Sequence, residues 1–122
     1  MASRETKFRQ AAFVYLHVAI LYEAAAYVMA RNDMLPSRFG SPWLWLLFGA
    51  IVAGIVFTGL WRWQNAWFAR IVWAIHGLRI PALIRGAFFA APDARLPPAF
   101  YITALFVVSV NLWMLARAGW DL

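Results

Sequence analysis

Apolar residues fill three long stretches of the chain, residues 11–30, 42–60 and 99–116. A helix needs roughly 20 predominantly apolar residues to cross a hydrocarbon core of ~30 Å, and each stretch comes close to that length. The pattern therefore predicts an all-α integral membrane protein with three transmembrane helices, organised as a single membrane domain over residues 1–122.

A fourth apolar stretch, residues 66–91, contains three arginines. An arginine near the centre of a bilayer costs about 2.5–3.5 kcal/mol on insertion scales, which argues against a fourth span. We therefore expect an interfacial helical segment on the cytoplasmic surface, with its aromatic side chains at the headgroup boundary. The predicted contacts with lipid headgroups are Arg70, Arg79, Arg85, Trp67 and Trp73.

Gly77 and Pro81 should break this segment into two short helical pieces, 66–76 and 81–91, because proline cannot continue a preceding helix but can start a new one. Two alternatives stay open for it. The segment could be a fourth span, or a partner subunit could cover its apolar surface.

The charge distribution predicts an orientation. Lys and Arg number three before the first stretch and five between the second and third, against two and one in the other two segments. By the positive-inside rule the N-terminus is cytoplasmic and the C-terminus is outside. The net charge of +6 then indicates contact with anionic phospholipid rather than with nucleic acid. The abundance of Arg and Ala is typical of a GC-rich bacterial genome, so we expect a bacterial cytoplasmic membrane.

A cleavable signal peptide is the alternative for the first stretch, since a basic leader precedes an apolar run that ends in small residues. The run is long for such a peptide, and His17 and Glu23 interrupt it. A membrane helix is therefore the favoured interpretation.

Composition removes several classes of chemistry. The chain is 65% hydrophobic and contains no cysteine, which excludes disulfides, thiolate metal sites, iron–sulfur clusters and cysteine nucleophiles. Nucleophile elbows, phosphate-binding loops and paired acidic motifs are also absent from the sequence. We expect no catalytic activity from the chain itself, and we predict no catalytic residue and no metal site.

The first apolar stretch has a seven-residue repeat. Ala12, Ala19 and Ala26 recur at this spacing, with Tyr15 and Tyr22 between them. Small and aromatic residues on one helix face predict a packing seam.

Glu23 and Tyr27 flank that seam, and a carboxyl group in a membrane helix must face protein or water. Glu23 could carry a proton or contact a cation, or it could be a protonated, hydrogen-bonded structural residue near the outer interface. Asn111 in the third stretch is a candidate hydrogen-bond partner. The predicted contacts with a partner or an ion are Glu23, Tyr27, Tyr22 and Asn111.

His17 lies in the same stretch, away from the seam. A transmembrane histidine can ligate haem or the magnesium of a chlorin, but a bis-histidine haem needs a second intramembrane histidine. The only other one, His76, falls in the predicted surface segment. We therefore predict no cofactor, and haem or chlorin at His17 stays the alternative to a hydrogen bond with a neighbouring helix.

Two classes of function fit these patterns. The first is a small accessory subunit of a larger respiratory, photosynthetic or secretion complex, packed against partner subunits and lipids. The second is a self-assembling channel or transporter, a homo-oligomer whose pathway would contain Glu23, Tyr27, Asn111 and Thr58. A lipid-modifying enzyme ranks below both, because His76, Arg79 and Asp93 are a poor set for catalysis.

Overall fold

The computed structural model describes residues 3–32, 42–89 and 96–122, and it is all-helical over them. The predicted all-α class is thus confirmed. The elements are α1 (Arg4–Arg31), α2 (Pro42–Thr58), a π-helical turn η1 (Gly59–Trp63), α3 (Ala66–Gly77), α4 (Ile80–Phe88) and α5 (Pro98–Trp120).

Four helical stretches are long and apolar enough to cross a membrane, consistent with an integral membrane protein. They are Arg4–Met29, Trp43–Trp63, Ala66–Phe88 and Pro98–Trp120. The expectation of three spans plus a surface segment is not confirmed, because Ala66–Phe88 has the length and apolar composition of a span.

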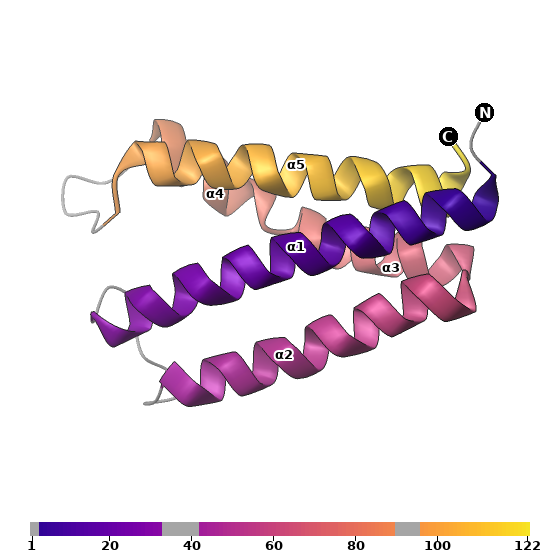
Figure 1. Ribbon diagram of the computed structural model, residues 1–122. Helices are drawn as coiled ribbons and strands as arrows, with labels where there is room; N and C mark the ends of the chain where they lie inside the picture. Colours follow the sequence, from indigo (N-terminus) through magenta and orange to yellow (C-terminus); the bar gives the residue numbers. More distant parts are fainter. Residues whose placement is uncertain (1–2, 33–41, 90–95) are drawn as a thin grey trace.

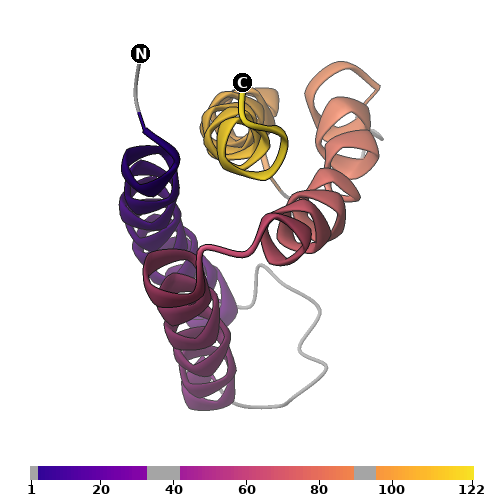
Figure 2. The same cartoon turned by 90° about the vertical axis from the view of Figure 1, so that its right-hand side faces the viewer.

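The four stretches run antiparallel to one another along the chain, so both termini lie at the same end of the bundle (Figure 1). We call this the terminal end, and the opposite end the loop end. Seen along the bundle, α1 pairs with α2, and α5 lies between α1 and the pair formed by α3 and α4 (Figure 2). Because α4 lies on the far side of α5, α2 and α4 are well separated.

The span-length stretch Ala66–Phe88 is broken in its middle. Pro81 has no N–H to donate to the Gly77 carbonyl, and its ring would clash with that carbonyl in a continuous helix. Leu78 N–H instead closes α3 on the Ala74 carbonyl at 3.2 Å, and Arg79 N–H bonds the His76 carbonyl at 3.2 Å. The break therefore occurs where Gly77 and Pro81 predict it.

Two glycines let aromatic rings pack against backbone. A Cβ on Gly59 would overlap the ring of Phe68, and a Cβ on Gly86 would overlap the ring of Tyr101. The first contact sets the corner between α2 and α3, which Asn65 completes by accepting a hydrogen bond from Trp67 N–H at 2.8 Å as the N-cap of α3. The second holds α4 against α5.

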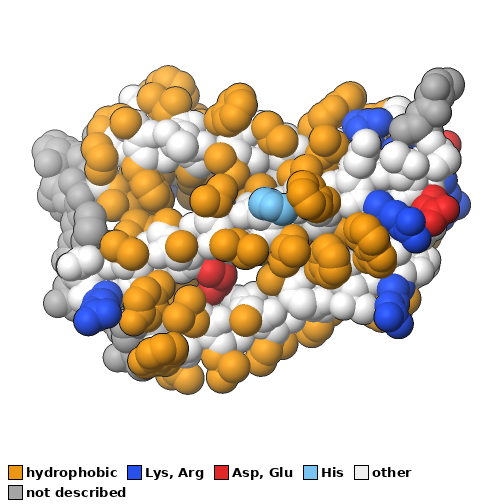
Figure 3. All heavy atoms as spheres, in the orientation of Figure 1, with side chains coloured by type: hydrophobic (Ala, Val, Ile, Leu, Met, Phe, Trp, Pro, Cys, Tyr) orange, Lys and Arg blue, Asp and Glu red, His pale blue; other side chains and the backbone are white. Residues whose placement is uncertain are grey.

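The fully buried large side chains are Phe8 of α1, Leu60 of η1 and Leu115 of α5. They belong to one core cluster, to which α2 and α3 also contribute. The cluster fills the bundle toward the terminal end. On the face shown in Figure 3, most charged side chains lie at that same end and apolar side chains cover most of the rest, with one acidic side chain and one histidine in between and a basic side chain toward the loop end. This distribution is what a hydrocarbon environment around the middle of the helices requires.

Cationic side chains also join separate elements at the terminal end. These hydrogen bonds are Lys7 to the Asp121 carboxylate, Arg4 to the Gln64 carbonyl, Arg70 to the Gly119 carbonyl, and Arg117 to the Gln10 side chain. The Lys7–Asp121 ion pair, at 2.8 Å, fixes the end of α5 to the first turn of α1.

This ion pair predicts a pH-dependent stability. The hydrogen bond and positive charge of Lys7 hold the pKa of Asp121 below its ordinary value of 3.8. Because the folded pKa is the lower one, the stabilisation is complete above the unfolded pKa and is lost as pH falls through the folded pKa. We expect Asp121→Asn to lower the melting temperature in neutral detergent at pH 7, and the difference from wild type to be smaller at about pH 2.

Glu5→Gln is the matched control, since Glu5 pairs with Arg9 at 2.8 Å within one exposed helical turn. Its effect at pH 7 should be the smaller of the two. A melting difference for Asp121→Asn that is the same at both pH values would contradict the assignment.

Candidate functional site

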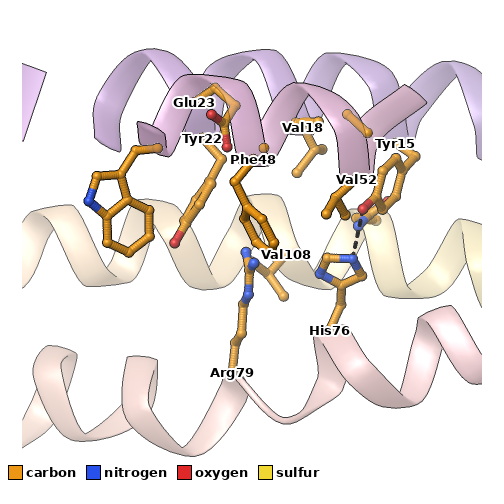
Figure 4. A pocket seen from close by; sticks show the side chains of 14 residues that line it. Tyr15, Val18, Tyr22, Glu23, Phe48, Val52, His76, Arg79 and Val108 are labelled. Carbon is orange, nitrogen blue, oxygen red and sulfur yellow. Dashed lines mark hydrogen bonds between the residues drawn. The ribbon is translucent and has the colours of Figure 1, made fainter. Parts of the chain in front are cut away.

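A cavity of about 130 Å³ lies between α1, α2, α3 and α5, on the loop-end side of the core cluster (Figure 4). Its walls are mainly apolar, as Val18, Phe48, Val52 and Val108 illustrate. The polar side chains that line it are Tyr15, Tyr22, Glu23, His76, Arg79 and Asn111. Apolar walls with a few converging polar groups are typical of a small-molecule site.

The predicted seam of α1 forms one wall. Tyr15, Ala19 and Tyr22 follow one another at helical spacing, and all three line the cavity. Ala12 is fully buried in the core cluster, so the same seam serves packing in one part and the cavity in another.

Tyr15 and His76 join α1 to α3. The Tyr15 hydroxyl lies 2.9 Å from Nε2 of His76, and the two rings meet edge to face. His76 is in the last turn of α3, so it lies inside the bundle beside the α3–α4 break.

The Glu23 carboxyl group packs against α2 at Gly49. A Cβ on Gly49 would overlap that carboxyl group, so only glycine leaves room for it. Glu23 Oε2 is buried and has no hydrogen-bond partner among the described residues. An unpaired carboxyl oxygen at this depth is costly, and a bound group with a hydrogen-bond donor would relieve the cost.

Arg79 reaches the cavity from the α3–α4 break (Figure 4). Its guanidinium carbon lies 4.5 Å from the centroid of the Tyr22 ring, a cation–π contact. Within the part of the chain that the structure describes, Arg79 forms no ion pair or hydrogen bond through its side chain. Its five N–H donors are therefore available to an acceptor in the cavity.

Asn111 is the most deeply buried polar group of the site. Its relative exposure is 2%, and its Oδ1 atom has no hydrogen-bond partner in the described ranges. A buried amide oxygen left unpaired costs about 1–3 kcal/mol. Among the described residues, the cavity thus contains two unpaired acceptors and one cation that no carboxylate reaches within ion-pair distance.

Two other predicted residues lie outside this cluster. Tyr27 packs edge to face on Trp43, with the ring centroids 6.0 Å apart. His17 is exposed, and its Nδ1 lies 2.8 Å from the Phe13 carbonyl of its own helix. Nothing in the described chain brings a second histidine to His17, and no group of three metal-ligating side chains occurs in those residues.

The predicted headgroup residues are dispersed. Arg70 lies between the rings of Trp67 and Trp120, at 5.0 and 5.4 Å from their centroids, and Trp73 packs edge to face on Trp120. Arg85 is exposed on α4. Contact of all five residues with lipid headgroups stays a prediction, and Arg79 also lines the cavity.

The sequence analysis missed the inward orientation of His76 and Arg79. A usable signal was present, because an arginine near the middle of a span-length apolar stretch most often marks a polar interior rather than a membrane surface.

Comparison of the chain with protein-family models, with curated proteins and with solved structures finds no match. The chemistry of the cavity is therefore the basis on which a function can be proposed.

Gly49 and Gly54 provide a matched test of this site on one helix. A Cβ at Gly54 meets nothing within 4 Å, whereas a Cβ at Gly49 overlaps Glu23. We expect Gly54→Ala to leave the melting temperature unchanged or to raise it, by up to about 1 kcal/mol of helix propensity. Gly49→Ala should lower it, and Glu23→Ala should suppress that loss in the double variant. Equal effects of the two alanines would contradict the packing of Glu23 on Gly49.

Proposed function

We propose that the chain crosses the membrane four times, with both termini in the cytoplasm of a bacterial cell. The antiparallel order of four span-length helices supports the even number of crossings. Among the described residues, Lys and Arg number six at the terminal end, namely Arg4, Lys7, Arg9, Arg62, Arg70 and Arg117, against two toward the loop end, namely Arg31 and Arg85. Arg38 and Arg95 belong by sequence to the two connections between spans and lie outside the described residues. The positive-inside rule then favours a cytoplasmic terminal end. The alternative is three spans with 66–91 on the cytoplasmic surface and the C-terminus outside.

Single cysteines distinguish the two topologies, and the chain has no native cysteine to remove. Ser3→Cys and Leu122→Cys should both resist a membrane-impermeant maleimide in intact cells and react once the membrane is opened. Labelling of Leu122→Cys alone in intact cells would establish the three-span alternative.

We further propose that the protein binds an amphipathic, lipid-soluble molecule in its cavity. The observation that carries this proposal is the set of unpaired polar groups, Glu23, Arg79 and Asn111, that face one largely apolar space. Such groups are expensive without partners, and a polar head bound among them would relieve the cost.

The position of the opening supports entry from the lipid. Tyr22 and Phe48, which line the cavity, are 46% and 62% exposed. Both side chains extend from α1 and α2 toward Arg79 (Figure 4). Toward the terminal end, Phe8, Leu60 and Leu115 close the interior. A tail could thus extend sideways into the membrane while the head stays inside.

The accessory-subunit role is the second candidate. The exposure of Tyr22 and Phe48 at the cavity supports it, because a helix of a larger respiratory, photosynthetic or secretion complex could cover these side chains. The self-assembling channel or transporter with Glu23 in its pathway is less well supported. The closed terminal end gives a single copy no aqueous route, so this role requires a homo-oligomer.

Filling the cavity tests the binding function. Ala53 lines the cavity and Gly54 faces open space, so Ala53→Leu and Gly54→Leu add bulk inside and outside on the same helix. After purification in mild detergent, native mass spectrometry should detect a small amphipathic molecule on wild type and on Gly54→Leu but not on Ala53→Leu.

Two results would contradict the proposal. Equal retention of the molecule by Ala53→Leu would place it outside the cavity. Recovery of a stoichiometric membrane protein in its place, lost in the cavity-filled variant, would favour the accessory-subunit role.

A further inference from the structure

We propose that the occupant of the cavity is a phospholipid whose head combines a primary ammonium with a phosphate. This inference rests on the binding function proposed above and specifies the class of molecule. It follows from the charge and hydrogen-bonding capacity of three residues on three different elements.

The acid group of the occupant is indicated by Arg79. Its guanidinium contacts the face of the Tyr22 ring, and no carboxylate of the described residues lies within ion-pair distance. A planar guanidinium with free N–H donors matches the oxygens of a phosphate. The cation–π contact holds it in place without consuming those donors.

The donor group of the occupant is indicated by Asn111 and Glu23. The side chain of Asn111 is buried with Oδ1 unpaired, and Glu23 Oε2 is buried and unpaired on a neighbouring wall. Both atoms require hydrogen-bond donors, which a primary ammonium supplies and a quaternary ammonium does not. With Glu23 ionised, its charge and that of Arg79 sum to zero, and a zwitterionic head complements both.

The depth of the site favours a lipid over a water-soluble amine. Glu23 lies eight residues before the end of α1 at Arg31, a rise of roughly 12 Å from the loop end, and Asn111 lies thirteen residues beyond the start of α5 at Pro98, roughly 20 Å from that end. The polar groups therefore lie in the middle of the bundle, at a depth where hydrocarbon surrounds the helices and a lipid is the accessible ligand. The exposed Tyr22 and Phe48 mark where its tails would leave the bundle.

The experiment uses the whole protein in nanodiscs with equal fractions of phosphatidylethanolamine, phosphatidylcholine and phosphatidylglycerol. Native mass spectrometry counts the lipids that stay bound after release. We expect phosphatidylethanolamine to be retained over phosphatidylcholine on the order of fivefold, since the heads differ in their N–H donors. Equal retention of these two lipids, or a preference for phosphatidylglycerol, would overturn the proposal.

Two sets of variants separate the roles of the residues. Asn111→Leu and, independently, Glu23→Ala should bring the ratio of phosphatidylethanolamine to phosphatidylcholine close to one, because each removes an acceptor. Arg79→Gln should reduce all three lipids alike, because they share the phosphate. Thr103→Val and Arg85→Gln are the controls, since Thr103 bonds its own helix at the Ala99 carbonyl and Arg85 is exposed on α4. An unchanged ratio in Glu23→Ala would contradict the proposal even if Asn111→Leu does not fold.

Two further measurements are needed. One distinguishes a membrane lipid from a water-soluble occupant, and the other distinguishes failure of the headgroup inference from failure of the binding function. Phosphoethanolamine added to phosphatidylcholine nanodiscs should leave the melting temperature unchanged, and stabilisation by this soluble head would identify a water-soluble occupant instead. If Ala53→Leu loses all lipids while wild type retains them without preference, the headgroup inference fails and the binding function stands. If Ala53→Leu retains lipids as wild type does, both fail.

Discussion

A break in a membrane helix must face protein or water, because hydrocarbon offers its backbone groups no hydrogen-bond partners. Pro81 imposes such a break on the stretch Ala66–Phe88, because it has no N–H to donate to the Gly77 carbonyl. Two side chains beside the break point into the bundle, where His76 bonds Tyr15 of α1 and Arg79 contacts Tyr22. We attribute the cavity to this break. The polar side chains beside it make contacts with α1, so they cannot fill the interior as the apolar side chains of a continuous helix would.

The two ends of the bundle differ in how tightly they are packed. Toward the terminal end, fully buried Phe8, Leu60 and Leu115 pack tightly, and Lys7 ties α1 to the end of α5 through Asp121. Toward the loop end, the cavity is partly open, since its lining residues Tyr22 and Phe48 are exposed. A rigid end that holds the helices in register allows the other end to keep unpaired polar groups in fixed positions, which is what selective binding of a small head requires.

Much of this arrangement could be predicted from the sequence. Apolar length predicts the helices, Gly77 and Pro81 predict the break, and the repeat of Ala12, Ala19 and Ala26 predicts a packing seam on the first helix. Glu23 and Asn111 are identified as polar residues that need partners. What could not be predicted is which residues Arg79 meets. An arginine in a span-length apolar stretch indicates a polar interior. Helical periodicity does not carry across a break, however, so the sequence cannot place Arg79 against the ring of Tyr22.

The depth of the α3–α4 break tests the central claim most directly. Gly77 lies eleven residues beyond Ala66, a rise of roughly 16 Å, which is about halfway through a bilayer core. A Cβ at Gly77 or at Gly54 of α2 meets nothing within 4 Å, so both sites tolerate a nitroxide label on cysteine. In liposomes, the label at Gly77 should collide with oxygen and avoid a water-soluble nickel chelate to the same degree as the label at Gly54. Ready collision with the nickel chelate at Gly77 alone would place the break at the membrane surface and contradict the four-helix account.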